Sequence, residues 1–84
     1  MSKTEEILRK WEKEDAAVSM EYHTDELNIQ CSGDTHTPIF SNEKFVLIVG
    51  DMIIEGILKE ANLIDKNTIK FVLKNDEKII LKKC

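Results

Sequence analysis

One stretch of the sequence decides the fold: Phe45-Val-Leu-Ile-Val-Gly50-Asp51-Met-Ile-Ile-Glu-Gly56. Its first five residues are apolar and rich in β-branched side chains, which predicts a strand buried on both faces. The pair Gly50-Asp51 then predicts a two-residue type II′ hairpin turn, because that turn favours glycine at its first central position. In this register Gly56 on the returning strand faces Phe45, so that an aromatic ring covers a strand glycine.

The returning strand extends from Met52 to about Ile64, with a bend or bulge near Gly56. A helix is the alternative for Ile53 to Ile64, since several apolar residues there would share one helical face: Ile54, Ile57, Leu58 and Ala61. We favour the strand because glycine destabilises a helix interior.

Two further strands are predicted after this hairpin, over Thr68–Lys74 and Lys78–Lys83. A three-residue loop, Asn75-Asp76-Glu77, would join them and pair Leu73 with Ile79 and Phe71 with Leu81. The outer face would then carry a row of lysines, with Lys74 opposite Lys78 and Lys70 opposite Lys82. The whole meander covers about residues 44–83.

A separate hairpin is predicted over about residues 18–31, where apolar and polar side chains alternate. A turn centred on Thr24-Asp25 would set Tyr22 opposite Leu27 and put the apolar side chains of both strands on one face. Residues 32–38 follow as a loop that holds the only proline of the chain.

A short helix is predicted at the N-terminus, over about residues 3–15. Ser2-Lys3-Thr4-Glu5 has the pattern of a capping box, and Ile7, Leu8 and Trp11 share one helical face behind it. Trp11 either packs against the sheet or anchors a partner. The predicted fold is therefore α+β, in one domain of 84 residues: a short N-terminal helix followed by an antiparallel β meander or small β-barrel of five to six strands.

The charge is acidic overall and unevenly distributed. The net charge is −4, with −5 on residues 1–34 and +1 on residues 35–84. This acidity argues against non-specific binding to nucleic acid. The sequence has no apolar leader and no run of about 20 apolar residues, so we expect a cytoplasmic protein without a membrane partner. Cys31 and Cys84 are too few for a disulfide scaffold and are expected to be free thiols.

The sequence shows no residue pattern typical of catalysis or metal binding. Cys31 and His36 lack the closely spaced pairs of a zinc site. Asp34, His36 and Asp51 could supply a general base, but no partnered nucleophile or phosphate-binding loop accompanies them. We therefore expect no enzymatic activity, no metal and no cofactor.

The segment from Phe45 to Asn62 resembles the Sm-like small β-barrel family. In that family an apolar strand leads through a tight turn into a bent strand with a central glycine, then an acidic residue and an asparagine. Here Gly50-Asp51 matches the turn, Gly56 the glycine and Asn62 the acidic position. The resemblance covers about residues 44–83 and implies a barrel that binds nucleic acid.

Two functions are compatible with these patterns. The first is a non-enzymatic binding module, an inhibitor or adaptor that contacts a protein partner through an acidic or aromatic surface; its contact residues would be Trp11, Glu21, Asp25 and Glu26. The alternative is a nucleic-acid-binding Sm-like barrel that uses the lysine face of the last hairpin: Lys70, Lys74, Lys78 and Lys82. An exposed last strand would also allow a homodimer.

Overall fold

The computed structural model describes residues 3–41 and 43–84. These ranges contain one helix, α1 (Lys3–Lys13), and seven antiparallel strands: β1 (Ala17–His23), β2 (Asn28–Phe40), β3 (Phe45–Val49), β4 (Met52–Gly56), β5 (Leu58–Asp65), β6 (Thr68–Leu73) and β7 (Lys78–Lys83). The α+β class is confirmed. The count of five to six strands is wrong, because the long returning strand is divided into β4 and β5. The described part of the chain has no helix with the length and apolar character that a bilayer span requires.

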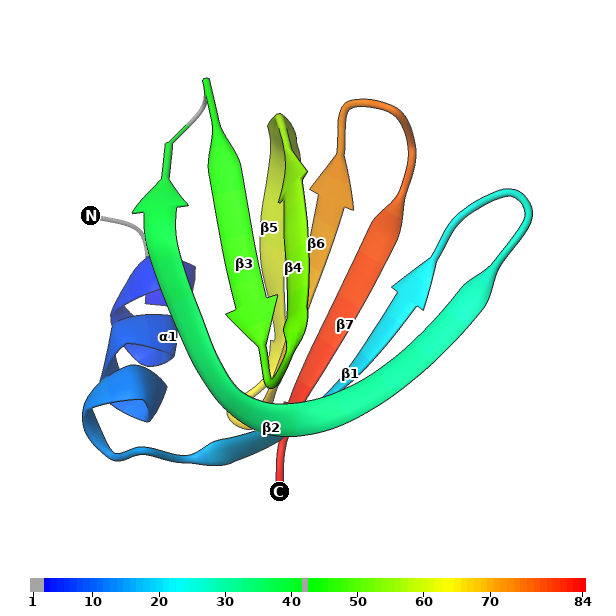
Figure 1. Cartoon of the computed structure of the whole chain (residues 1–84). Helices are drawn as coiled ribbons and strands as arrows, with labels where there is room; N and C mark the ends of the chain where they lie inside the picture. The colour runs from blue at the N-terminus through cyan, green and yellow to red at the C-terminus, as the bar shows by residue number, and fades with distance from the viewer. Residues whose placement is uncertain (1–2, 42) are drawn as a thin grey trace.

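The strands form one curved sheet in the order β4-β3-β2-β1-β7-β6-β5. β1 and β7, from opposite ends of the chain, therefore pair near its centre. The sheet folds over on itself, so that the edge strand β4 lies in front of the other edge strand, β5 (Figure 1). The enclosed core contains the packed rings of Phe45 and Phe71, whose centroids are 4.9 Å apart.

β2 joins the two parts of this curved sheet. Its first half pairs with β1 and its second half pairs with β3. The predicted loop at residues 32–38 is therefore wrong, because those residues lie inside β2. Thr35 and Thr37 are buried while His36 and Pro38 are exposed, so the polar composition hides an ordinary strand alternation. A register shift between His36 and Ile39 accommodates the proline.

The bend of β2 depends on a backbone contact between two glycines. Gly33 has a φ of 153°, and a Cβ added to it would lie 2.8 Å from the Cα of Gly50. Gly50 has a φ of 57°, as the first central position of a type II′ turn requires, and its N–H donates to the carbonyl of Asp34 at 3.0 Å. The backbone of β2 therefore crosses the β3–β4 turn so closely that a side chain at Gly33 would clash with the turn.

The predictions for the deciding stretch are confirmed. β3 and β4 pair with Gly56 opposite Phe45, and Val49 and Met52 flank the two-residue turn. Residues 53–64 form strands rather than a helix, and the chain leaves the β conformation at Ile57, directly after the glycine at which a bend was expected.

Both other hairpins differ from the predicted register by two residues. In the first hairpin Tyr22 pairs with Ile29, and in the last hairpin Phe71 pairs with Ile79. The predictions of Tyr22 opposite Leu27 and Phe71 opposite Leu81 are wrong, because the turns are centred one residue away from their predicted positions. A shift of two residues keeps each side chain on the predicted face, so the core is nevertheless the expected one.

Helix α1 ends two residues earlier than predicted, in a Schellman motif. Asp15 has a φ of 52°, its N–H donates to Glu12, and the N–H of Ala16 donates to the carbonyl of Trp11 at 3.0 Å. Ser2, the first residue of the predicted capping box, lies outside the described residues. Trp11 is only 2% exposed and packs in the core together with Leu8.

Two helix side chains hold the backbone of β2 at Thr37. The carboxylate of Glu12 accepts the Thr37 N–H, and the guanidinium of Arg9 donates to the Thr37 carbonyl at 2.6 Å. Arg9 and Glu12 also form an ion pair with each other at 3.1 Å. This clamp gives partners to the N–H and C=O of Thr37, a buried residue of β2.

Substituting Gly33 tests the bend of β2. We expect Gly33→Ala to lower the free energy of unfolding by about 1–3 kcal/mol, because alanine is strained at this φ and its Cβ meets backbone. Gly56→Ala is the matched control, since its Cβ would meet only the flexible end of Leu73. Urea denaturation measures both variants, and an equal loss in the two would contradict a special role for Gly33.

Substituting Glu12 tests the clamp. Glu12→Ala leaves the N–H of Thr37, a residue only 1% exposed, without its acceptor, which should cost about 1–3 kcal/mol of unfolding free energy. Glu14→Ala removes only an exposed contact to Lys83 and should cost less than about 1 kcal/mol. Thermal or urea unfolding distinguishes the two. Similar losses would mean that the helix is held by packing alone.

Candidate functional site

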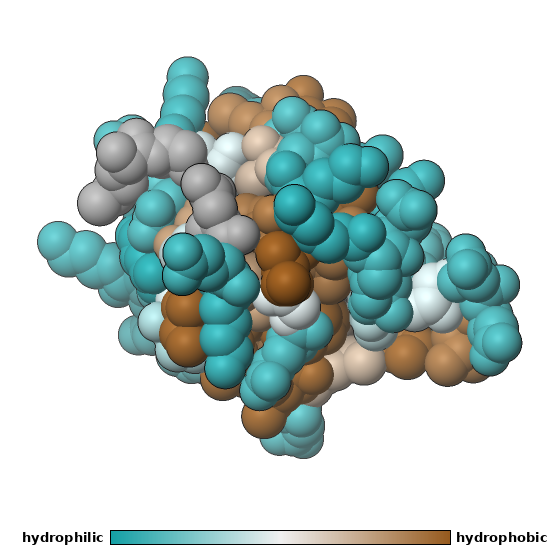
Figure 2. Space-filling view, turned by 90° about the horizontal axis from the view of Figure 1, so that it is seen from above, coloured by the Kyte–Doolittle hydropathy of each residue, from teal (hydrophilic) through white to brown (hydrophobic). Residues whose placement is uncertain are grey.

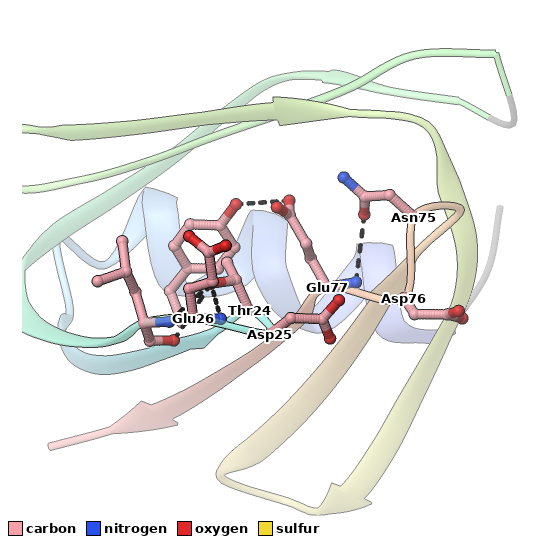
Figure 3. Close-up of a pocket in the computed structure, with 8 residues that line it drawn as sticks. Thr24, Asp25, Glu26, Asn75, Asp76 and Glu77 are labelled. Carbon is pink, nitrogen blue, oxygen red and sulfur yellow. Dashed lines mark hydrogen bonds between the residues drawn. The ribbon is translucent and has the colours of Figure 1, made fainter.

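A groove of about 460 Å³ opens between the β1–β2 turn and the β6–β7 turn. We call it the acidic groove, and its lining residues are Tyr22, Thr24, Asp25, Glu26, Leu27, Asn75, Asp76 and Glu77. The lining holds four carboxylates and no basic side chain. Figure 3 shows the residues of the two turns next to one another, with Glu77 pointing toward the β1–β2 turn and Asp76 pointing away from it. This end of the molecule is largely hydrophilic when it is seen from above (Figure 2).

The β1–β2 turn brings two acids to its tip. The Thr24 hydroxyl accepts the N–H of Leu27 at 2.9 Å and that of Glu26 at 3.3 Å, and the Thr24 N–H donates to the carbonyl of Leu27. The side chain of Thr24 therefore takes over part of the turn's hydrogen bonding. Asp25 and Glu26 stand at the exposed tip of this structure.

The β6–β7 turn supplies the opposite wall. The Asp76 N–H donates to the carbonyl of Leu73, and Asp76 itself has a φ of 66°, which is the pattern of a three-residue hairpin loop. The Asn75 side chain accepts the N–H of Glu77 at 3.2 Å. Asp76 also forms an exposed ion pair with Lys59 at 3.7 Å.

One hydrogen bond spans the groove from wall to wall. The Tyr22 hydroxyl donates to the carboxylate of Glu77 at 2.5 Å. Burial raises the pKa of Tyr22 to about 12, and the hydrogen bond and negative charge of Glu77 contribute in the same direction. This bond fixes the separation of the two turns, and it leaves Asp25, Glu26 and Asp76 as the exposed acids of the groove.

The groove combines negative charge with apolar surface. Leu27 is 59% exposed beside the acids, and the ring of Tyr22 is half-buried next to it. Long basic side chains bury their methylene stems against apolar surface while their charged ends meet carboxylates. The arrangement therefore suits a lysine or arginine side chain.

The structure separates the four residues predicted to contact a protein partner. Asp25 and Glu26 line the acidic groove. Trp11 as a partner anchor is wrong, because its side chain is buried in the core between the helix and the sheet. Glu21 lies on the outer face of β1, where the side-chain amide of Gln30 donates to it at 3.5 Å, and it is not part of the groove.

The lysines of the predicted row keep their face of the last hairpin, but their predicted pairing is wrong. Lys70 pairs with Ile80, Lys78 with Val72 and Lys82 with Thr68, so the expected lysine pairs across the last hairpin do not form. The physical reason is the two-residue shift in register, which places a neutral residue opposite each lysine within the strands. Lys74 lies in the turn after β6.

The sequence patterns did not single out six of the groove residues as site candidates: Tyr22, Thr24, Leu27, Asn75, Asp76 and Glu77. Two acids after an asparagine in a predicted turn were a usable signal, because Asn and Asp favour tight turns and the tips of hairpins. What the patterns lacked was the pairing of β1 with β7, which sets the two turns side by side.

Other candidate chemistry is sparse in residues 3–41 and 43–84. No group of three or more His, Cys, Asp or Glu side chains is arranged to hold a metal ion there. Both cysteines are free thiols; burial raises the pKa of Cys31, and its Sγ lies 3.8 Å from the carbonyl oxygen of Val49.

Comparison of this chain with protein-family models, with curated proteins and with solved structures finds no match.

The bond between Tyr22 and Glu77 can be tested by titration, because Tyr22 is the only tyrosine. We expect its phenolate absorbance to appear with a pKa of about 12, and Glu77→Gln to lower that value while burial keeps it above 10. The folded pKa exceeds the unfolded one, so stability should fall as pH rises from 10 to 12. Asp76→Asn is the control, and an unchanged titration in Glu77→Gln would show that the bond does not form.

Proposed function

We propose that the protein is a non-enzymatic binding module whose acidic groove binds a basic segment of a protein partner. The observation that carries the proposal is the groove, in which two turns from distant parts of the chain bring four carboxylates around an exposed leucine and a tyrosine. An inhibitor or adaptor of this kind acts by covering a basic segment that its partner uses elsewhere.

Charge favours this proposal over binding to nucleic acid. The chain has a net charge of −4, and its lysines on the last hairpin alternate with neutral residues instead of forming pairs. Phosphate groups would meet repulsion at the groove, whereas arginine and lysine would be attracted to it.

A peptide of alternating arginine and glycine tests the proposal, because it carries charge without a preferred conformation. We expect it to bind the wild-type protein at low salt and to bind a triple variant, Asp25→Asn/Glu26→Gln/Asp76→Asn, at least about tenfold more weakly. Isothermal titration calorimetry measures both affinities. The three substitutions remove charge and the exposed ion pair between Asp76 and Lys59, and asparagine tolerates the positive φ of Asp76.

A second triple variant, Glu6→Gln/Glu43→Gln/Glu60→Gln, is the matched control for net charge. All three glutamates are exposed and lie outside the acidic groove. If both triple variants lose affinity equally, binding follows net charge and the groove is not the site. Tighter binding of a single-stranded oligonucleotide than of the peptide would instead favour the nucleic-acid alternative.

A further inference from the structure

One edge of the sheet offers unpaired backbone groups. β4 is the last strand in the sheet order and pairs only with β3. Val49 and Met52 flank a two-residue turn and are a hydrogen-bonded pair, so alternation makes Ile48–Ile53 and Val46–Glu55 the non-hydrogen-bonded pairs. The N–H and C=O groups of Ile53 and Glu55 therefore point away from β3. Within the described residues, the N–H and C=O groups of Ile53 and Glu55 form no hydrogen bond to the backbone of a turn or loop.

This edge has little of the usual protection of an edge strand, since exposed Glu55 is the only charged side chain in β4. β4 contains no lysine and no proline, and Ile53 is 61% exposed. The opposite edge differs, because β5 contains Lys59 and two register shifts. β4 is therefore the edge suited to receive another strand.

An apolar strip lies on the concave face beyond this edge. Met20 is fully buried on β1, but Tyr22 and its partner Ile29, which continue the same face, are only half-buried. Leu27 extends the strip and is largely exposed. Figure 1 shows β1 and the first half of β2, the strands that carry this strip, extending to the right of β4.

The free edge of β4 runs toward the acidic groove. Ile57, which follows β4, accepts the N–H of Lys74 at 2.8 Å, and Lys74 directly precedes the groove residue Asn75. The opposite end of β4 lies near β2, because Val49, which pairs with Met52, has its carbonyl 3.8 Å from the Cys31 Sγ, and Cys31 is two residues from the strip residue Ile29. A segment laid along β4 would therefore have the strip beside it and the groove at its end.

From these observations we infer that the partner's basic segment binds as an added strand on β4. Its backbone bonds to Ile53 and Glu55, its alternate apolar side chains cover the strip of Tyr22, Leu27 and Ile29, and its lysine or arginine enters the acidic groove. This mode of recognition combines main-chain hydrogen bonds with a side-chain pocket. The inference rests on the proposed function.

Charge complementarity selects such a segment over a second copy of the chain. Paired antiparallel, a second β4 strand would bring its Asp51, which directly precedes the strand, toward a groove that already holds four carboxylates. A basic extended segment brings the opposite charge to the same place.

Two peptides of equal charge test the inference. The first alternates threonine and valine and carries two arginines at each end; in the second, proline replaces two of the threonines, so that it cannot form a strand. We expect the first peptide to bind about tenfold more tightly. Hydrogen exchange followed by NMR should show that the Ile53 and Glu55 amides exchange quickly in the free protein and become protected only by the first peptide.

Ile53→Pro removes the N–H of residue 53 at the free edge of β4 and leaves the hydrogen bonds between β3 and β4 in place. In this variant the two peptides should bind equally, whereas Ile53→Ala, which keeps the N–H, should preserve the preference. The exchange measurement uses the wild-type protein, so it decides the question even if the proline variant does not fold.

The outcomes separate this inference from the proposed function. If both peptides bind the wild-type protein equally and leave the Ile53 and Glu55 amides unprotected, strand addition is wrong while the acidic groove remains a binding site. If neither peptide binds, and the arginine–glycine peptide does not bind either, both proposals fail.

Discussion

The close contact between Gly33 and Gly50 is the constraint on which the rest of the structure depends. It lets β2 pass across the β3–β4 turn and pair with β1 on one side of the molecule and with β3 on the other. Without this crossing the sheet could not fold over, and Phe45 would not reach Phe71. Helix α1 then completes the structure, because Trp11 and Leu8 pack in the core and Arg9 and Glu12 hold β2 at Thr37.

The sequence predicted which face of the sheet each side chain occupies better than it predicted which residues pair across the strands. A period of two assigns each side chain to the inner or outer face, and a slip of two residues leaves that assignment intact. The core residues of β1, β6 and β7 could therefore be identified although both hairpin registers were wrong. The β3–β4 hairpin was predicted in full, because Gly50 restricts the turn to one type and so fixes the pairing.

The failures have local physical causes. Residues 32–38 resemble a loop because a glycine needed for a crossing, a proline at a register shift and two inward threonines share one strand. The groove was only half visible in the sequence. Asp25 and Glu26 belong to one turn, whereas Asp76 and Glu77 join them only through the pairing of β1 with β7. A local sequence pattern cannot predict a contact between segments as far apart in the chain as β1 and β7.

The pairing of β1 with β7 also determines when the molecule can acquire its structure. During synthesis β1 and β2 emerge early, but β1 has only one of its two neighbours until residues 78–83 have been made. The buried face of Val18 and Met20 therefore waits for Ile79 and Leu81. Contacts between distant parts of a chain slow folding, and a waiting edge strand is exposed to wrong pairings. The tip of this early hairpin carries Asp25 and Glu26, and negative charge opposes association of one chain with another.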